Sequence, residues 1–281
     1  MKSSAQGKSG ALDAAPPALL CMGCGYDLGG LASGDACPEC GRSVRSSLAS
    51  GRAGTPVQGP PTVRGLAGTV LLVWRRPVRV WDRVRVDMGL ASQLELPVVF
   101  VATAAAAAAA GAAVWSTTKG GAGQLAFWII VLMVFAWPPT FLMLLLLNLV
   151  ERRGVRLWGK AHGSRVTPDV ARWVTAHASA GWLGGALVTL AAVLACTAAS
   201  TAWGPLGWID PTAVLIGGAA VALLWFETLV YVGVRRLRFV NVAASEAHLA
   251  DSATDDGPAP RSGGGGDRAC GSGGPGGQHI E

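Results

Sequence analysis

Four cysteines near the start of the chain are the residues whose types and spacing point most directly to chemistry. They form the pattern C-x2-C-x12-C-x2-C and are Cys21, Cys24, Cys37 and Cys40. A two-residue gap lets both thiolates of a pair face one ion, and two such pairs supply the four sulfur ligands that a structural zinc ion prefers. Gly25 and Gly41 follow the two pairs and allow the backbone to turn tightly around a metal. The motif therefore predicts a zinc site.

A redox-active dithiol and a pair of disulfides are the alternatives for these cysteines. Both are disfavoured, because the expected compartment is reducing and no thioredoxin-like βαβ pattern surrounds the motif. Four thiolates would close the coordination sphere of zinc to water. The sequence thus predicts a metal that stabilises the fold and takes no part in catalysis.

The stretch CxxCGYDLxGL followed by CPECG resembles the zinc ribbon at the N-terminus of many bacterial multi-pass membrane proteins. The resemblance covers about residues 21–45 and implies zinc binding. It lies in the four cysteines and in Gly25, Tyr26, Asp27 and Leu28. Gly29 stands where an arginine is frequent in that family, so an anionic contact made by that arginine is not implied here. The arrangement of the spans and the Gly-containing inner loop are also faintly similar to Yip1-type membrane domains.

The rest of the chain has the composition of a membrane protein. Of its 281 residues, 51% are hydrophobic and 14% are charged, and the apolar residues gather in long blocks. A helix needs about 20 apolar residues to cross a hydrocarbon core. Four blocks reach that length: 96–115, 125–150, 178–202 and 212–234. The first is so rich in alanine that a buried soluble helix is its alternative. The sequence predicts an all-α membrane protein, a four-helix transmembrane bundle preceded by a small cytoplasmic zinc ribbon.

Lys and Arg follow the pattern that keeps positive loops in the cytoplasm. Of 23 such residues, 22 lie before the first block, between the second and third, or after the fourth, and only Lys119 lies on the other side. Residues 1–20 contain no apolar core of the length that a secretory signal needs. We therefore expect a multi-pass protein of the inner membrane with both termini in the cytoplasm. Tryptophans flank the two expected outer loops, as is common at headgroup level: Trp115, Trp128, Trp203 and Trp208.

The segments outside the bundle are predicted from composition. They are a disordered N-terminus at 1–20, the zinc ribbon at 21–45, a flexible Gly/Ser/Pro-rich linker at 46–65, an interfacial amphipathic segment at 66–95 and a disordered Gly-rich tail at 241–281. A helix starting at Pro77 would place Trp81 and Val84 on one face and arginines on the other, which suits the inner membrane surface. The alternative is a strand, because VRV occurs twice with period two. Thr167, followed by Pro168, predicts a helix start in the inner loop.

Several residues within the spans are candidates for other roles. Glu227 could mark an ion or proton pathway, although it lies close enough to the inner surface to reach headgroup water or an arginine. Pro138 and Pro139 should kink the second span, and such a break can line a transport site. Gly181 and Gly185 lie four apart, on a surface where another helix could pack or a homo-oligomer could form. His162 and His177 are expected to be loop residues, because no carboxylate or cysteine near them completes a metal set. Cys196 is expected to be a small core residue and Cys270 an incidental thiol, and Asn148, near the end of a span, is a weaker candidate than Glu227.

The most favoured function is a docking or regulatory scaffold that contacts the lipid bilayer through its spans and a cytoplasmic protein through the ribbon. A small transporter or channel that uses Glu227 and the Pro138–Pro139 kink is one alternative. A membrane-tethered nucleic-acid-binding regulator is the other, disfavoured because the ribbon offers only Tyr26 for base stacking. No nucleophile elbow, phosphate loop or paired-carboxylate motif occurs, so no enzymatic activity is predicted.

The distribution of charge yields a topology that fusion reporters can test. Reporters placed before Cys21 and after Val240 should both report the cytoplasm, and one inserted at Gly121 should report the outside, because positive loops stay inside. A cytoplasmic signal at Gly121 would remove the first span from this topology.

Overall fold

The computed structural model describes residues 18–60, 62–86, 91–118, 121–203 and 210–241. These residues are all-helical, with two isolated β-bridges and no β-strand among them, so the predicted fold class is confirmed. The helices are α1 (Val44–Ser47), η1 (Pro56–Gln58), α2 (Val63–Arg75), α3 (Val80–Arg83), α4 (Ala91–Thr118), α5 (Ala122–Phe135), α6 (Trp137–Ala161), α7 (Pro168–Ala178), α8 (Ala180–Trp203) and α9 (Pro211–Leu237). The ends predicted to be disordered lie mostly outside the described residues, as does Trp208.

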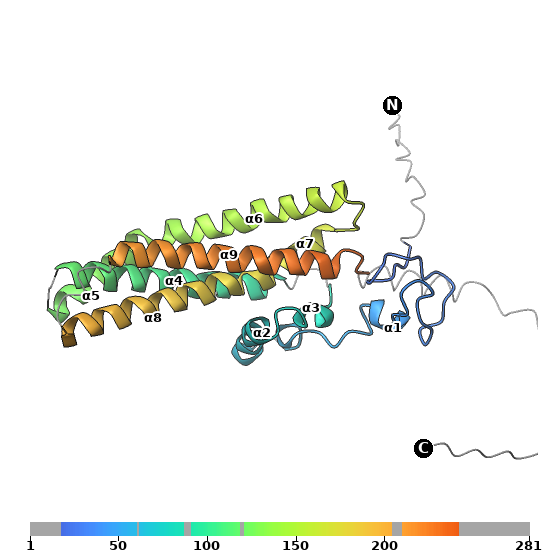
Figure 1. Cartoon of the computed structure of the whole chain (residues 1–281), viewed down its shortest axis with the longest axis horizontal. Coiled ribbons are helices and arrows are strands. Elements are labelled where there is room, and N and C mark those ends of the chain that lie inside the picture. The colour runs from blue at the N-terminus through green and yellow to red at the C-terminus, as the bar shows by residue number, and fades with distance from the viewer. Residues whose placement is uncertain (1–17, 61, 87–90, 119–120, 204–209, 242–281) are drawn as a thin grey trace, which may run out of the picture.

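Three stretches are each long and apolar enough to cross a membrane, and the bent pair α5–α6 makes a fourth if it counts as one span. The three are Ala91–Ser116, Pro168–Ala199 and Pro211–Leu237. In Figure 1 these long helices run side by side along one axis, and the N-terminal segment lies at one end of them. The prediction of a bundle of membrane-spanning helices is confirmed.

The double proline shapes the second span as predicted. α5 and α6 meet at a bend of 45°, and Pro138 and Pro139 occupy the first turn of α6. A proline in the first turn removes an N–H that has no helical partner there, so α6 can begin but α5 cannot continue through it. α6 then runs to Ala161, well past the predicted end at residue 150. α7 begins after Thr167, whose side chain caps it as predicted.

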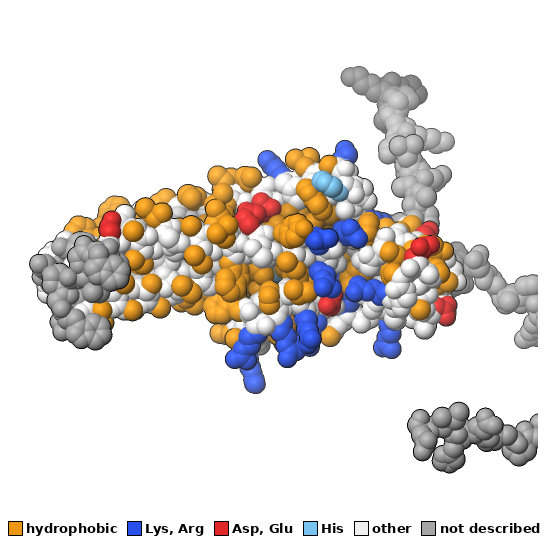
Figure 2. All heavy atoms as spheres, viewed as in Figure 1, with side chains coloured by type: hydrophobic (Ala, Val, Ile, Leu, Met, Phe, Trp, Pro, Cys, Tyr) orange, Lys and Arg blue, Asp and Glu red, His pale blue; other side chains and the backbone are white. Residues whose placement is uncertain are grey.

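The surface divides into an apolar part and a charged part. Large aliphatic and aromatic side chains are exposed along α5, α6 and α9, among them Phe135, Leu142 and Ile216. Figure 2 shows that Lys and Arg side chains gather on the half of the body nearer the N-terminal segment, while the visible face of the other half carries none. Exposed apolar surface of this extent suits a hydrocarbon solvent, since lipid tails are as apolar as the side chains themselves.

α8 and α9 pack closely because glycines remove side-chain volume between them. A Cβ at Gly181 would lie 2.8 Å from the backbone nitrogen of Phe226, and one at Gly185 would clash with Ala222. Gly218 of α9 faces α8 in the same way. The predicted helix-packing surface therefore exists, but α9 of the same chain covers it. Contrary to expectation, Gly181 and Gly185 are not free for a second copy, because glycine spacing indicates a close approach and not which helix makes it.

The segment 46–65, predicted to be a flexible linker, is packed against the protein instead. Arg52 is 5% exposed, and its Nη1 donates a hydrogen bond of 2.9 Å to the carbonyl of Val84. The Oε1 atom of Gln58 accepts hydrogen bonds from the backbone N–H groups of Thr55 and Arg85. The composition correctly indicates few apolar anchors. Buried polar side chains replace them by satisfying backbone groups, which fixes the segment in place.

The amphipathic helix predicted from Pro77 onward is also corrected. The helix lies earlier, as α2, and Pro77 follows its end, where a proline cannot continue a helix. Only the single turn α3 comes after it. Trp81 is fully buried, and a Cβ at Gly233 of α9 would lie 2.8 Å from its ring. The buried apolar residues of this part of the chain therefore pack on protein.

The residues that follow α3 match the alternative, extended reading. Val84 and Val86 are fully buried, and Arg85 between them is half-buried, which is the alternation that a period of two produces. They pair with no other strand among the described residues. Residues 87–90, which include Met88 of the predicted apolar face, lie outside the described part of the chain.

The glycine contact between α8 and α9 can be tested by a matched pair of substitutions. Gly185→Ala should destabilise the protein by about 1–3 kcal/mol, because the added methyl group must displace Ala222. Gly217→Ala adds the same group where nothing lies within 4 Å, so it should be neutral or slightly stabilising. The readout is the thermal unfolding midpoint of the purified chain in detergent. Equal effects of the two substitutions would contradict the close packing.

Candidate metal centre

Two similar turns bring the four cysteines together. The N–H of Gly25 donates to the carbonyl of Cys21 at 2.8 Å, and the N–H of Gly41 donates to that of Cys37 at 2.9 Å. Both glycines have a positive φ, 83° and 71°, in the left-handed region that only glycine adopts without strain. The isolated bridges Leu20–Asp27 and Ala36–Ser43 close the base of each turn. The predicted role of the two glycines is thus confirmed.

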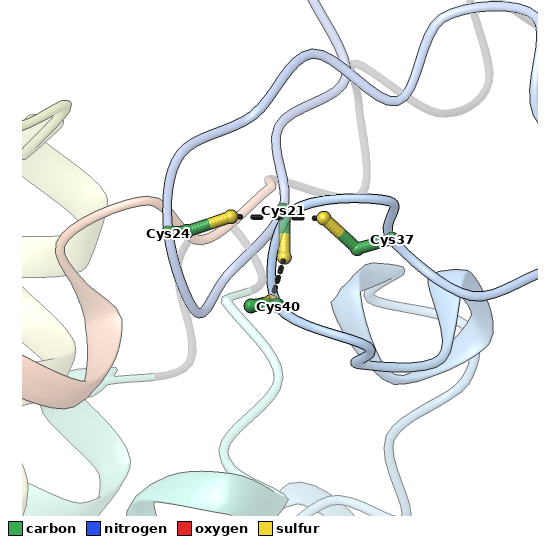
Figure 3. Close-up of side chains that lie close together, drawn as sticks. All are labelled: Cys21, Cys24, Cys37 and Cys40. Atoms are coloured by element: carbon green, nitrogen blue, oxygen red, sulfur yellow. Dashed lines mark hydrogen bonds between the residues drawn. The ribbon is translucent and has the colours of Figure 1, made fainter.

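The four sulfur atoms lie within 4.8 Å of one another and form no disulfide. Figure 3 shows the four side chains pointing toward a common centre. The Sγ atoms of Cys21 and Cys40 are 3.5 Å apart, and those of Cys24 and Cys37 are 3.6 Å apart. With metal–sulfur bonds of about 2.3 Å, a tetrahedral zinc site needs sulfurs about 3.8 Å apart. The cysteine cluster therefore has the size and shape that a metal ion with four sulfur ligands requires.

The thiols of the cluster differ in how readily they ionise. Burial opposes ionisation of Cys21, but N–H groups of Cys24 and Gly23 and the neighbouring thiols favour its thiolate, and its pKa falls to about 6. The N–H of Tyr26 favours the Cys24 thiolate, but desolvation and the other three sulfurs outweigh it and raise the pKa to about 12. Cys21 thus loses its proton more readily than Cys24. A divalent cation at the centre would offset the negative charge of neighbouring thiolates, and so favour ionisation of the remaining thiols.

Residues just past the end of α9 hold this cysteine-containing segment, residues 18–47, at the end of the bundle. Asn241 is 4% exposed; its Oδ1 accepts from the N–H of Leu20, and its Nδ2 donates to the carbonyls of Leu20 and Ser47. Phe239 lies so close to Gly25 that a Cβ there would be 3.0 Å from its ring. Leu20 and Asn241 fall within the ends predicted to be disordered, and the structure orders both. The ribbon is therefore seated on the bundle.

A second polar cluster, which the sequence analysis did not identify, lies between the spans. Glu95 is 4% exposed and forms an ion pair with Arg152, while its Oε1 accepts a 2.8 Å hydrogen bond from Nδ2 of Asn148. The fully buried Asn148 also accepts from the indole N–H of Trp182 and donates to the hydroxyl of Ser179. This Glu95 cluster links α4, α6 and α8. The sequence did contain a signal for this cluster. Glu95 directly precedes the first predicted span, and Asn148 and Arg152 lie at the end of the second, so all three were expected at the same depth along the bundle.

The other candidates occupy separate places. Glu227 is exposed on α9 and faces Glu151 across a cleft of about 290 Å³, and neither forms an ion pair among the described residues. Among the described residues, Glu227 therefore does not form the ion pair with an inner-loop arginine that the sequence allowed. His177, predicted to be a loop residue, is instead fully buried on α7. Its Nδ1 donates to the carbonyl of Trp173, and its Nε2 lies 3.4 Å from the hydroxyl of Thr55. Cys196 lies alone on α8.

Comparisons with family models, with curated proteins and with solved structures find no match for this chain. The chemistry of the cysteine cluster follows from its donors. Four sulfurs fill a tetrahedral coordination sphere and leave no position for water or substrate, which is the arrangement of a structural site. Among the described residues, no other group of three or more His, Cys, Asp or Glu side chains could hold a metal ion.

The Glu95 cluster predicts strong coupling between its two charged members. Glu95→Gln leaves the guanidinium of Arg152 without its counter-charge and should cost roughly 3 kcal/mol, the lower end for buried pairs, because the Arg152 side chain is 24% exposed. Arg152→Gln should cost a similar amount. The double variant should lose clearly less than the sum of the two. Additive losses in thermal unfolding would show that the ion pair contributes no coupling.

Proposed function

We propose that this chain is an integral protein of the inner membrane in which a structural zinc ribbon, held rigidly at the cytoplasmic end of the bundle, serves as a docking or regulatory scaffold. The observation that carries this proposal is the seating of the ribbon. Asn241 and Phe239 fix one side of it to the end of α9, and its other side faces solvent. A rigid, exposed module is suited to protein recognition, because little ordering entropy is lost when a partner binds.

Zinc is the metal that the cysteine cluster fits best. Four thiolates in a tetrahedral arrangement suit Zn²⁺, and each compact C-x2-C turn directs two thiolates at one ion. When bound, the ion would supply cross-linking of the two turns and no reactivity. The apolar residues around the thiols are few, chiefly Leu28 and Val44. A segment with so small a core depends on such a cross-link for its fold.

The charge distribution supports a cytoplasmic position for the ribbon. It lies at the same end of the bundle as Arg153, Arg165 and Arg238, and such positive clusters stay on the inner side. A reducing compartment would also keep the thiols available for metal.

The exposed side of the ribbon indicates the kind of partner. Tyr26 is 40% exposed, and Asp27, Asp35 and Glu39 are exposed around the two turns. Residues 21–45 contain these three carboxylates and two arginines, and four thiolates around Zn²⁺ would add two further negative charges. An acidic surface with an exposed aromatic residue suits a basic protein partner and repels nucleic acid. It therefore favours a protein scaffold over the nucleic-acid-binding alternative.

The transporter alternative gains no comparable support. Charged residues of transport pathways face the bundle interior or a water-filled cavity. Glu227 is exposed on α9 and lines the cleft that it shares with Glu151. This cleft lies beside the charged turns of α6, at one end of the spans, and not midway along the bundle. Two polar side chains that the bundle buries, Glu95 and Asn148, hydrogen-bond to each other. A structural role accounts for them.

The scaffold proposal predicts the behaviour of a matched pair of cysteine variants. The purified full chain should contain one zinc ion, and Cys37→Ser should lose it, because three thiolates leave the coordination sphere open. Cys196→Ser, which removes the isolated thiol of α8, should retain the metal. Metal analysis of detergent-purified protein is the measurement. A chromophoric iron–sulfur cluster, or zinc retained by Cys37→Ser, would contradict the assignment.

The same pair tests docking. Proteins captured with the wild type from detergent extracts should be retained by Cys196→Ser and lost with Cys37→Ser. Glu39→Lys, which reverses an exposed charge without touching a ligand, should weaken capture while the zinc content stays unchanged. Identical capture by all variants would show that the ribbon is not the docking element.

A further inference from the structure

A positively charged cleft lies where the chain turns back after α6. It has a volume of about 630 Å³. Its cationic side chains are Arg153, Arg156 and Lys160 on α6 and Arg165 on the returning segment. Residues 164–167 form its opposite wall, and Leu157 and Val166 are its apolar members. The volume is within the range of ligand sites, roughly 300–1,000 Å³.

The cleft is built by local structure that holds its two walls together. Residues 153, 156 and 160 lie three and four apart, so they share one face of α6. Gly159 of the same helix lets the return segment approach, because a Cβ there would lie 2.6 Å from Val166. The N–H of Ser164 donates to the carbonyl of Gly159 at 2.8 Å, and Gly163 makes the turn with a φ of 63°. The separation of the walls is thus fixed by the backbone.

The charges of the cleft are not neutralised within the described part of the chain. The side chains of Arg153, Arg156 and Lys160 are exposed and form no hydrogen bond or ion pair with another described residue. Arg165 donates to a backbone carbonyl, that of Ala18, and so keeps its full charge. Asp169, at the start of α7, is engaged by Arg172. Four like charges around one hollow repel each other, and an anion bound between them relieves that repulsion.

The position of the cleft along α6 indicates where the anion comes from. Val150 is the last of a run of exposed aliphatic residues on α6 before the charged turns. Arg153 to Lys160 follow it by about 5–15 Å along the helix, at 1.5 Å per residue. The headgroup layer is roughly 5–8 Å thick on each side of the hydrocarbon core. With the core ending near Val150, this layer contains Arg153 and borders Arg156, and Lys160 lies on its aqueous side. Trp158, 39% exposed at the same level, is of the type that gathers among headgroups.

We propose that this cleft binds the phosphate-containing headgroup of an anionic phospholipid from the membrane that the helices cross. The guanidinium groups of Arg153 and Arg156 contact phosphate oxygens, because a planar guanidinium can donate two parallel hydrogen bonds to one phosphate. Lys160 and Arg165 add positive charge. Leu157 and Val166 lie against the glycerol and the first methylene groups of the lipid. This site goes beyond the scaffold function and depends on neither the metal nor a protein partner.

Lipid binding to the purified full chain tests the proposal. The chain in a neutral detergent is titrated with phosphatidylglycerol or phosphatidylcholine, and bound lipid is counted by native mass spectrometry. The wild type should bind phosphatidylglycerol far more tightly than phosphatidylcholine. Arg153→Gln combined with Arg156→Gln should weaken phosphatidylglycerol binding by about thirty-fold, since each basic residue near a membrane surface contributes about five-fold.

Matched variants separate the cleft from total charge. Arg75→Gln with Arg76→Gln removes the same charge from exposed positions at the end of α2, outside the cleft, and should leave the affinity nearly unchanged. Arg153→Lys with Arg156→Lys keeps the charge but loses the paired guanidinium contacts, so its affinity should lie between those of the wild type and the glutamine pair. An unchanged thermal unfolding midpoint is the check on folding. Equal weakening by the glutamine pairs at 75/76 and at 153/156 would overturn the proposal.

Two further outcomes identify other occupants. Glycerophosphoglycerol, the headgroup of phosphatidylglycerol without its acyl chains, carries the same phosphodiester and should bind much more weakly than the lipid. If it binds equally well, the cleft takes soluble phosphates and the lipid assignment is wrong. If phosphatidylglycerol binds only after residues 242–281 are deleted, the acidic tail of the chain itself is the occupant, and the proposal fails in the same way.

Discussion

Close approach to α9 at positions without a side chain is the contact on which the rest of the structure depends. Gly181 and Gly185 let α8 lie directly against its middle turns. Gly233 makes room for the buried ring of Trp81, which brings the arginine-rich segment onto the same helix. Gly25 accepts the ring of Phe239 just past its end. One helix therefore positions the spans, the charged segment and the cysteine cluster, and it does so through shape more than through specific hydrogen bonds.

The interactions that stabilise the molecule differ between its apolar part, which suits hydrocarbon, and its charged part, which suits water. Where the surface is apolar, hydrocarbon gives no hydrophobic drive between helices, so close packing and satisfied polar groups hold them together. The Glu95 cluster meets the second need, since each buried polar atom of Glu95 and Asn148 has a partner. At the charged end the surrounding solvent is water. There the segment from Arg52 to Val86 buries valines and a tryptophan, as a soluble protein would. The ribbon has few apolar residues, and contacts with Phe239 and Asn241, just past the end of α9, hold it in place.

The sequence was most informative where one local feature determines one structural outcome. The length of the apolar blocks identified the spans, and the double proline identified the bend. Thr167 identified the start of α7, and the cysteine spacing identified the cluster. It was least informative where residues distant in sequence meet. Glu95 and Arg152 are 57 residues apart, and Leu20 and Asn241 are 221 apart. The supposed linker was misread for the same reason: its anchors are polar, and the groups they bond, at Val84 and Arg85, lie elsewhere in the chain.

Seating of the ribbon on the bundle is the central claim, and hydrogen exchange of the full chain with and without a zinc chelator tests it most directly. If the ribbon is seated, metal removal will increase exchange in residues 21–45 and also in the contacts that hold them, 46–58 and 238–241, while the middle of α4, α8 and α9 stays protected. An increase confined to residues 21–45, with 46–58 exchanging rapidly in both states, would show a module on a loose tether and would contradict the account.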